Sequence, residues 1–110
     1  MIKYTTPTIS LTVEGIDLTG QDVYVSLEQG STELTKSGND LSISTETEDQ
    51  TTNTNISLVL SQEESAGFKY NQPVNVQVNW ISQQGVRAAT EIKSIPVMKN
   101  LLDEVIEYGD

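Results

Sequence analysis

The chain has 110 residues, with 16 aspartates and glutamates against 6 lysines and arginines, a formal net charge of −10, and no cysteine or histidine. Its length is sufficient for one domain with one hydrophobic core. The acidic balance excludes the basic surface that binding to nucleic acid or to anionic membranes requires. The missing residue types exclude disulfides, thiol chemistry and histidine-dependent catalysis.

Apolar and polar residues alternate along most of the chain, which predicts β-strands. Segments with turn chemistry, such as EGIDLTG, KSGND and SQQG, separate these strands. Six or seven short strands predict one domain over residues 1–99, an immunoglobulin-like antiparallel β-sandwich of about seven strands, with a closed barrel as the alternative. The apolar positions are Ile9, Leu11 and Val13, then Val23, Val25 and Leu27, then Leu41 and Ile43, then Ile56, Leu58 and Leu60, and finally Val74, Val76, Val78 and Trp80.

The segment TETEDQTTNTN, residues 45–55, is the most polar stretch and predicts a mobile loop or the tip of an extended hairpin. Glu46, Glu48 and Asp49 lie close together within it. Calcium needs about six to eight oxygen ligands, and the spacing of these carboxylates matches no EF-hand loop. We therefore expect a solvated acidic tip and no metal site.

The segment SQEESAGF, residues 61–68, interrupts the strand pattern. Ser61 and Glu64 have the three-residue spacing of a capping box, and Gly67 follows as a stop signal. We predict one short helical turn near residues 61–67 that crosses between the sheets, with Phe68 in the core.

The strand VNVQVNW, residues 74–80, has an apolar face and a face of three amides, Asn75, Gln77 and Asn79. Amides form hydrogen bonds in both directions without the desolvation cost of a charge. On an acidic chain, such a face suits contact with another acidic protein, so we predict that these three residues bind a partner. The alternative is an ordinary solvated strand surface. Trp80 is expected in the core, and Tyr24 is the better candidate for an exposed contact.

The final strand contains a change of phase. Thr90 and Ile92 share one face by simple alternation, whereas Ile95 and Val97 share the other. One extra residue near residues 93–94 would turn all four side chains inward, which predicts a bulged or broken last strand.

Residues 100–110 form a separate amphipathic tail in which Asn100 is a candidate helix cap. The tail predicts a short C-terminal helix that is too short to be stable alone. We predict that it binds a neighbouring subunit, the alternative being that it folds back over its own sheet. The predicted partner-binding side chains of the tail are Leu101, Leu102, Val105 and Ile106.

Carboxylate pairs can hydrolyse glycosidic bonds without any histidine. None of the glutamates in this chain lies in the apolar sequence context that an acid catalyst needs. We therefore predict no enzymatic activity, no catalytic residue and no cofactor.

Four segments together resemble a known group of proteins: LSQEESAGF, VNVQVNW, ATEIKSIPV and LLDEVIEYG. They resemble small acidic structural proteins of phages and prophages of Gram-positive bacteria. Residues 8–41, with DVYVSL as a second strand, are also similar to the N-terminal β-sandwich module of phage upper baseplate proteins.

This resemblance implies a virion structural protein of the tail or baseplate, whose partners are copies of itself or other tail and baseplate proteins. It implies a homo-oligomer or a part of a hetero-assembly. The segment MIKYTTPT lacks the apolar region of a signal peptide, so we expect production in the host cytoplasm and a place in the virion. A second hypothesis, from a different class, is a stand-alone binding module for a cell-surface glycan or protein.

Overall fold

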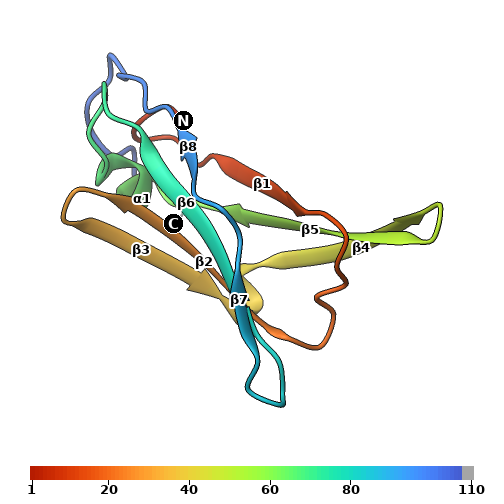
Figure 1. The fold of residues 1–110 in the computed structure, drawn as a ribbon. Helices are drawn as coiled ribbons and strands as arrows, with labels where there is room; N and C mark the ends of the chain where they lie inside the picture. Colours follow the sequence, from red (N-terminus) through yellow and green to blue (C-terminus); the bar gives the residue numbers. More distant parts are fainter. Residues whose placement is uncertain (108–110) are drawn as a thin grey trace.

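The computed structural model describes residues 1–107 and shows two antiparallel sheets packed face to face (Figure 1). The predicted antiparallel β-sandwich is confirmed, and the sheets do not close into a barrel. The first sheet has the order β1 (Thr8–Val13), β5 (Thr51–Val59), β4 (Ser42–Glu48). The second has the order β3 (Thr32–Ser37), β2 (Asp22–Gln29), β6 (Val74–Ile81), β7 (Arg87–Ala89), and β8 (Lys93–Ile95) also pairs with β6. This is the strand order B-E-D and C′-C-F-G of immunoglobulin-like sandwiches.

The last strand is broken, as predicted, so the described residues contain eight strands rather than about seven. β7 pairs with the end of β6, and β8 pairs with its beginning. The break lies at residues 90–92 rather than 93–94, because Thr90 bonds to Val78 through its backbone N–H (2.9 Å) and its hydroxyl (3.1 Å). Ile92 is consequently 63% exposed, so its predicted inward position is wrong. Val97 is buried as expected.

The core lies between the sheets and is almost entirely aliphatic, with Phe68 as its buried aromatic side chain. Two predicted core residues, Leu11 and Trp80, are only half-buried and pack against its edge. Trp80 lies one residue from the end of β6 and also lines a surface groove, which explains its partial exposure. The buried core side chains are Ile9, Val13, Leu18, Val23, Val25, Leu27, Leu41, Ile56, Leu58, Leu60, Phe68, Val74, Val76, Val78 and Val97.

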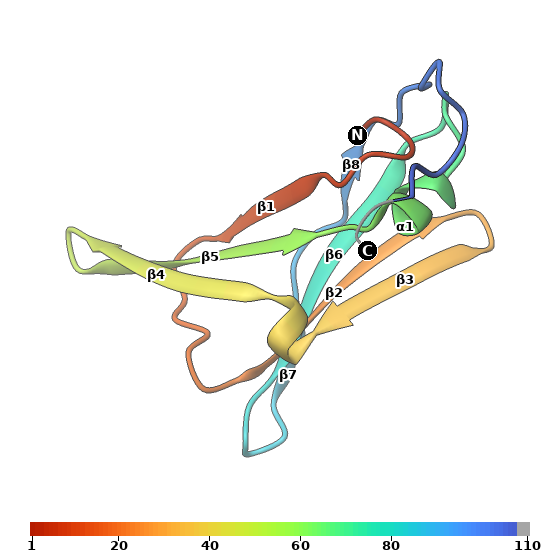
Figure 2. The ribbon, with the colours of Figure 1, turned by 180° about the vertical axis from the view of Figure 1, so that it is seen from behind.

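Residues 45–55 form most of an extended hairpin, so the alternative of a hairpin is confirmed over that of a loop. β4 and β5 run side by side beyond the second sheet, and the tip of the hairpin projects from the sandwich (Figures 1 and 2). The two tip residues, Asp49 and Gln50, have φ values of 51° and 69°. Positive φ at both central residues is what a two-residue type I′ turn requires.

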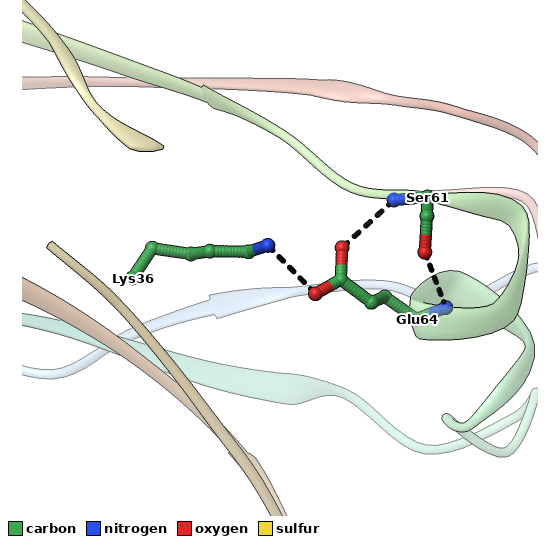
Figure 3. Close-up of polar contacts among 3 residues, drawn as sticks. All are labelled: Lys36, Ser61 and Glu64. Carbon is green, nitrogen blue, oxygen red and sulfur yellow. Dashed lines mark hydrogen bonds and ion pairs between the residues drawn. The ribbon is translucent and has the colours of Figure 1, made fainter. Parts of the chain in front are cut away.

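The predicted helical turn is present as α1 (Gln62–Ala66), which follows β5 and leads to the second sheet. A shorter 3-10 turn, η1 (Gly38–Asp40), connects β3 to β4. The capping box is complete: the Ser61 hydroxyl accepts from Glu64 N–H at 3.1 Å, and Ser61 N–H donates to Glu64 Oε1 at 2.9 Å (Figure 3). The other carboxylate oxygen of Glu64 lies 2.6 Å from Lys36 Nζ on β3. The glutamate therefore caps α1 and also ties it to the second sheet.

The C-terminal helix is not formed between Asn100 and Glu107, so that prediction is wrong for the described part of the tail; residues 108–110 lie outside it. Asn100 Oδ1 accepts from Leu102 N–H at 3.1 Å, the bond that a helix cap would accept, but no helical turn follows it. The backbone N–H and C=O of Ile106 are both bound by the side chain of Gln62. These contacts occupy backbone groups that a helix would need.

The carboxyl group of Glu64 links stability to pH. Its partial burial would raise its pKa, but the hydrogen bonds from Lys36 and Ser61 and the charge of Lys36 together hold the pKa below the ordinary value of about 4.5. Because the pKa of Glu64 is lower in the folded state, its negative charge stabilises the fold at pH values above the ordinary pKa. This stabilisation is lost as the pH falls through the lower, folded-state pKa.

We predict that Glu64→Gln, which can still accept from Ser61 N–H, lowers the free energy of unfolding by about 1 kcal/mol at pH 7. This difference from the parent should shrink as the pH falls below about 4. Urea unfolding at several pH values measures it, with the exposed neighbour Glu63→Gln as the control. A deficit that stays constant down to pH 3 would show that the charge of Glu64 contributes nothing.

Candidate functional site

The outer face of the second sheet carries the predicted amide row. The register pairs Asn79 with Tyr24, Gln77 with Ser26 and Asn75 with Glu28, and alternation turns all of them away from the core. The three amides lie side by side along β6 and are half-buried. The structure therefore brings this predicted set together on one surface.

Each of these amides forms a hydrogen bond to the chain's own last strand. Gln77 Nε2 donates to the Thr90 carbonyl at 2.9 Å, and Asn79 Oδ1 accepts from the Arg87 guanidinium at 3.2 Å. Asn75 Oδ1 accepts from the Ser94 hydroxyl at 3.3 Å. The sequence analysis did not predict that the amides bond to the last strand. The polar residues Arg87, Thr90 and Ser94 were the available signal, because each can bond to an amide.

Only one polar atom of each amide takes part in these bonds. Within the described residues, no hydrogen bond involves Asn75 Nδ2, Gln77 Oε1 or Asn79 Nδ2. One polar atom of each amide thus bonds to the broken strand β7–β8. The other polar atoms, two N–H₂ donors and one C=O acceptor, have no partner in the described residues.

A groove of about 420 Å³ lies at one end of this face. Tyr24 is 41% exposed there, and Arg87 supplies a cation. The lining combines two aromatic rings, an aliphatic side chain, hydroxyls, an amide and a guanidinium. Its lining residues are Tyr24, Ser26, Thr35, Asn79, Trp80, Ile81 and Arg87.

The tail forms a separate surface beside α1 and the N-terminal segment (Figure 2). Asn100 Nδ2 donates to the Lys3 carbonyl at 2.9 Å, while Gln62 Nε2 donates to Ile106 C=O at 2.9 Å and Gln62 Oε1 accepts from Ile106 N–H at 2.8 Å. Removal from solvent and the nearby Asp103 carboxylate raise the pKa of Tyr4.

The four predicted apolar residues of the tail remain open to solvent although its backbone is anchored. Leu101 is 94% exposed and Ile106 is 57% exposed, while Leu102 and Val105 are less so. The described part of the tail thus lies against α1 and the N-terminal segment rather than over its own sheet, and binding of its apolar side chains to a neighbouring subunit stays a prediction. No hydrogen bond within residues 1–107 joins it to the amide row.

The acidic hairpin tip lies far along the projecting arm and is solvated, with Glu46, Glu48 and Asp49 all exposed. In the part of the chain that the structure describes, no three histidine, cysteine, aspartate or glutamate side chains gather closely enough to hold a metal ion. Helices in the same part are too short and too polar to cross a membrane.

Neither protein families nor curated protein sequences supply a match to this chain.

The amide row generates a prediction about stability. Gln77→Glu removes the donor to Thr90 and places a carboxylate beside a carbonyl, so it should lower the free energy of unfolding by about 1–3 kcal/mol. Asn79→Asp is the matched variant, because it keeps the oxygen that accepts from Arg87 and should change stability by less than about 0.5 kcal/mol. Thermal and urea unfolding measure both. Equal stabilities would mean that the Gln77 bond does not hold the last strand.

The anchoring of the tail generates a second prediction. Gln62→Ala removes both hydrogen bonds to Ile106, so the tail should detach while the sandwich melts at nearly the parental temperature. Limited proteolysis should cut within residues 101–107 about thirtyfold faster than in the parent, because two bonds of about 1 kcal/mol each are lost. Gln83→Ala, on an exposed loop, is the control. Unchanged cleavage would show that other contacts hold the tail.

Proposed function

We propose that this protein is a non-enzymatic structural component of a phage or prophage particle, associated with the tail or baseplate, that acts by binding particle proteins or copies of itself. One observation carries the proposal: the outer face of the second sheet presents an uncharged row of half-buried amides next to a surface groove. The resemblance of LSQEESAGF and VNVQVNW to phage structural proteins supports it, and these segments form the connection after β5 that contains α1 and most of β6.

The charges of the chain favour this face as the interface. With a net charge of −10, two copies of the protein, or this protein and another acidic one, repel each other over most of their surfaces. The amide row avoids this penalty because Asn75, Gln77 and Asn79 are neutral and retain free hydrogen-bonding atoms, whereas Glu28 and Glu33 on the same face carry charge. Neutral polar groups also lose less on desolvation than carboxylates or ammonium groups. The face is thus suited to being covered by an acidic protein.

The second candidate function is a binding module for a cell-surface glycan or protein. The observation that favours it is the groove itself, where the half-exposed ring of Tyr24 lies near the polar groups of Asn79 and Arg87. An aromatic ring with adjacent hydrogen-bonding groups matches the mixed polar and apolar surface of a sugar.

The test uses a pair of nearly isosteric substitutions. The double variant Asn75→Asp, Asn79→Asp keeps both oxygens that accept from Ser94 and Arg87, and it adds two negative charges to the face. A strain that produces the particles is made to express the parent or the variant, and mass spectrometry of purified particles measures the ratio of the chain to the tail-tube protein. We expect a fixed ratio for the parent and a loss of at least about tenfold for the variant, since two buried like charges oppose docking.

The matched control is Gln83→Glu, Gln84→Glu, which adds the same charge on the exposed loop between β6 and β7 and should leave incorporation unchanged. Absence of the parent chain from particles would contradict the proposal, and normal incorporation of the amide variant would exclude this face. Binding of the parent to purified host cell-wall polysaccharide, lost in Tyr24→Ala, would instead support the second candidate.

A further inference from the structure

The strand β4 is an unprotected sheet edge. It pairs with β5 on one side only, and all seven of its residues are exposed. It forms one side of the arm that projects from the sandwich (Figure 1). The opposite side of β4 therefore presents backbone groups that no neighbouring strand binds within the described residues.

The turn determines which residues present these groups. In a two-residue hairpin the flanking residues, Glu48 and Thr51, form a hydrogen-bonded pair, and bonded and non-bonded pairs then alternate along the ladder. Thr47 and Thr52 are thus a non-bonded pair, and their hydroxyls lie 3.0 Å apart. The N–H and C=O groups of Ile43, Thr45 and Thr47 consequently point outward from the edge.

The other three edges are protected in ways that β4 is not. β3 carries Glu33 and Lys36, and the β7–β8 edge is interrupted at residues 90–92 and followed by Pro96. β1 lies beside the segment that contains Thr90, with a cleft of only about 20 Å³ between them. Charges, proline and interruptions are the usual means by which edges avoid pairing. β4 is uninterrupted and has no lysine, proline or glycine, and its only charged residues are the carboxylates Glu46 and Glu48.

We propose that two copies of this protein pair antiparallel through β4, with the two-fold axis at Thr45. This inference goes beyond the proposed function, because it concerns another surface and holds whether or not the protein belongs to a particle. The pairing joins two three-stranded sheets into one of six strands, β1-β5-β4-β4-β5-β1.

The charge pattern of β4 favours a second copy in this register. With Thr45 opposite the partner's Thr45, Ser44 lies opposite the partner's Glu46, and Ser42 lies opposite the partner's Glu48. Each carboxylate then faces a hydroxyl that can donate to it, and no glutamate faces another. Moving the axis to Thr47 would place Glu46 opposite the partner's Glu48, and moving it to Ile43 would leave a shorter paired segment.

The absence of cysteine makes the register directly testable. Directly opposed residues in a hydrogen-bonded antiparallel pair have Cα atoms about 5.5 Å apart, within the range of about 4.4–6.8 Å that a disulfide spans. Under mild oxidation, Thr45→Cys should therefore form a disulfide-linked dimer on a non-reducing gel. Two Thr47→Cys residues would be separated by about 14 Å along the strands, and cross-linking should be at least about tenfold lower. Similar cross-linking of both variants, or none by Thr45→Cys, would overturn the proposal.

Sedimentation of the unmodified protein provides the second measurement. One strand edge buries little area, so the dimer should form at about 0.1 mM rather than at nanomolar concentration. It should strengthen between about 0.05 and 0.5 M salt, because salt screens the repulsion between two acidic chains. Thr45→Lys should abolish it, whereas Thr51→Lys, which adds the same charge on β5, should not. A parent protein that remains monomeric at about 0.1 mM in high salt would overturn the proposal. An open-ended polymer would also overturn it, because it would indicate head-to-tail pairing of β4 with β1 of the next copy.

Discussion

The hydroxyl of Thr54, fully buried on β5, holds the first crossover between the sheets. It donates to the Ile16 carbonyl at 2.8 Å and accepts from Leu18 N–H at 3.0 Å. Those two residues lie in the connection from β1 to β2, and Leu18 is a core residue. Without this contact, the connection would bring unpaired backbone groups to the edge of the core, where they cost about 1–3 kcal/mol each.

The same solution recurs at two other positions. The buried side chain of Gln29 binds the loop before β6 by accepting from Lys69 N–H and donating to two carbonyls, and the buried hydroxyl of Ser65 donates to Thr5 C=O. No buried side-chain nitrogen or oxygen atom in residues 1–107 lacks a hydrogen-bond partner. The chain has no disulfide, and Lys36–Glu64 is the one ion pair of the described residues, so neutral polar side chains organise the connections. This gives a physical role to a composition in which threonine, serine, asparagine and glutamine outnumber charged residues.

The same chemistry shapes the surface. Asn75, Gln77 and Asn79 hold the broken last strand, and they also form an uncharged row on an acidic molecule, beside Glu28 and Glu33 on the same outer face. A row of lysines or glutamates would keep the strand solvated but would lose these intrachain bonds or the neutrality of the face. The structural and the proposed binding roles of the row therefore favour the same residue type.

Local patterns explain what could be predicted from the sequence. Alternation identified the apolar faces of β1, β2, β5 and β6, and the spacing of Ser61 and Glu64 identified α1, because these signals depend on neighbouring residues only. The position of the strand break depended on the bond between Thr90 and Val78, and the course of the tail depended on Gln62, 44 residues away from Ile106. Contacts of this kind leave no periodic signal. The amide row was predicted as a site, but its bonds to β7 and β8 depend on a strand pairing that alternation does not reveal.

The most direct test of this account is native-state amide hydrogen exchange at Leu18 and Lys69. Both N–H groups lie in connections rather than strands, and both donate to a buried side chain. The account predicts that they exchange about as slowly as the amides of β5 and β6, since opening them would require the core to open. Exchange as fast as that of the exposed Gln83 and Gln84 amides would show that the connections open independently and would contradict the central role of these side chains.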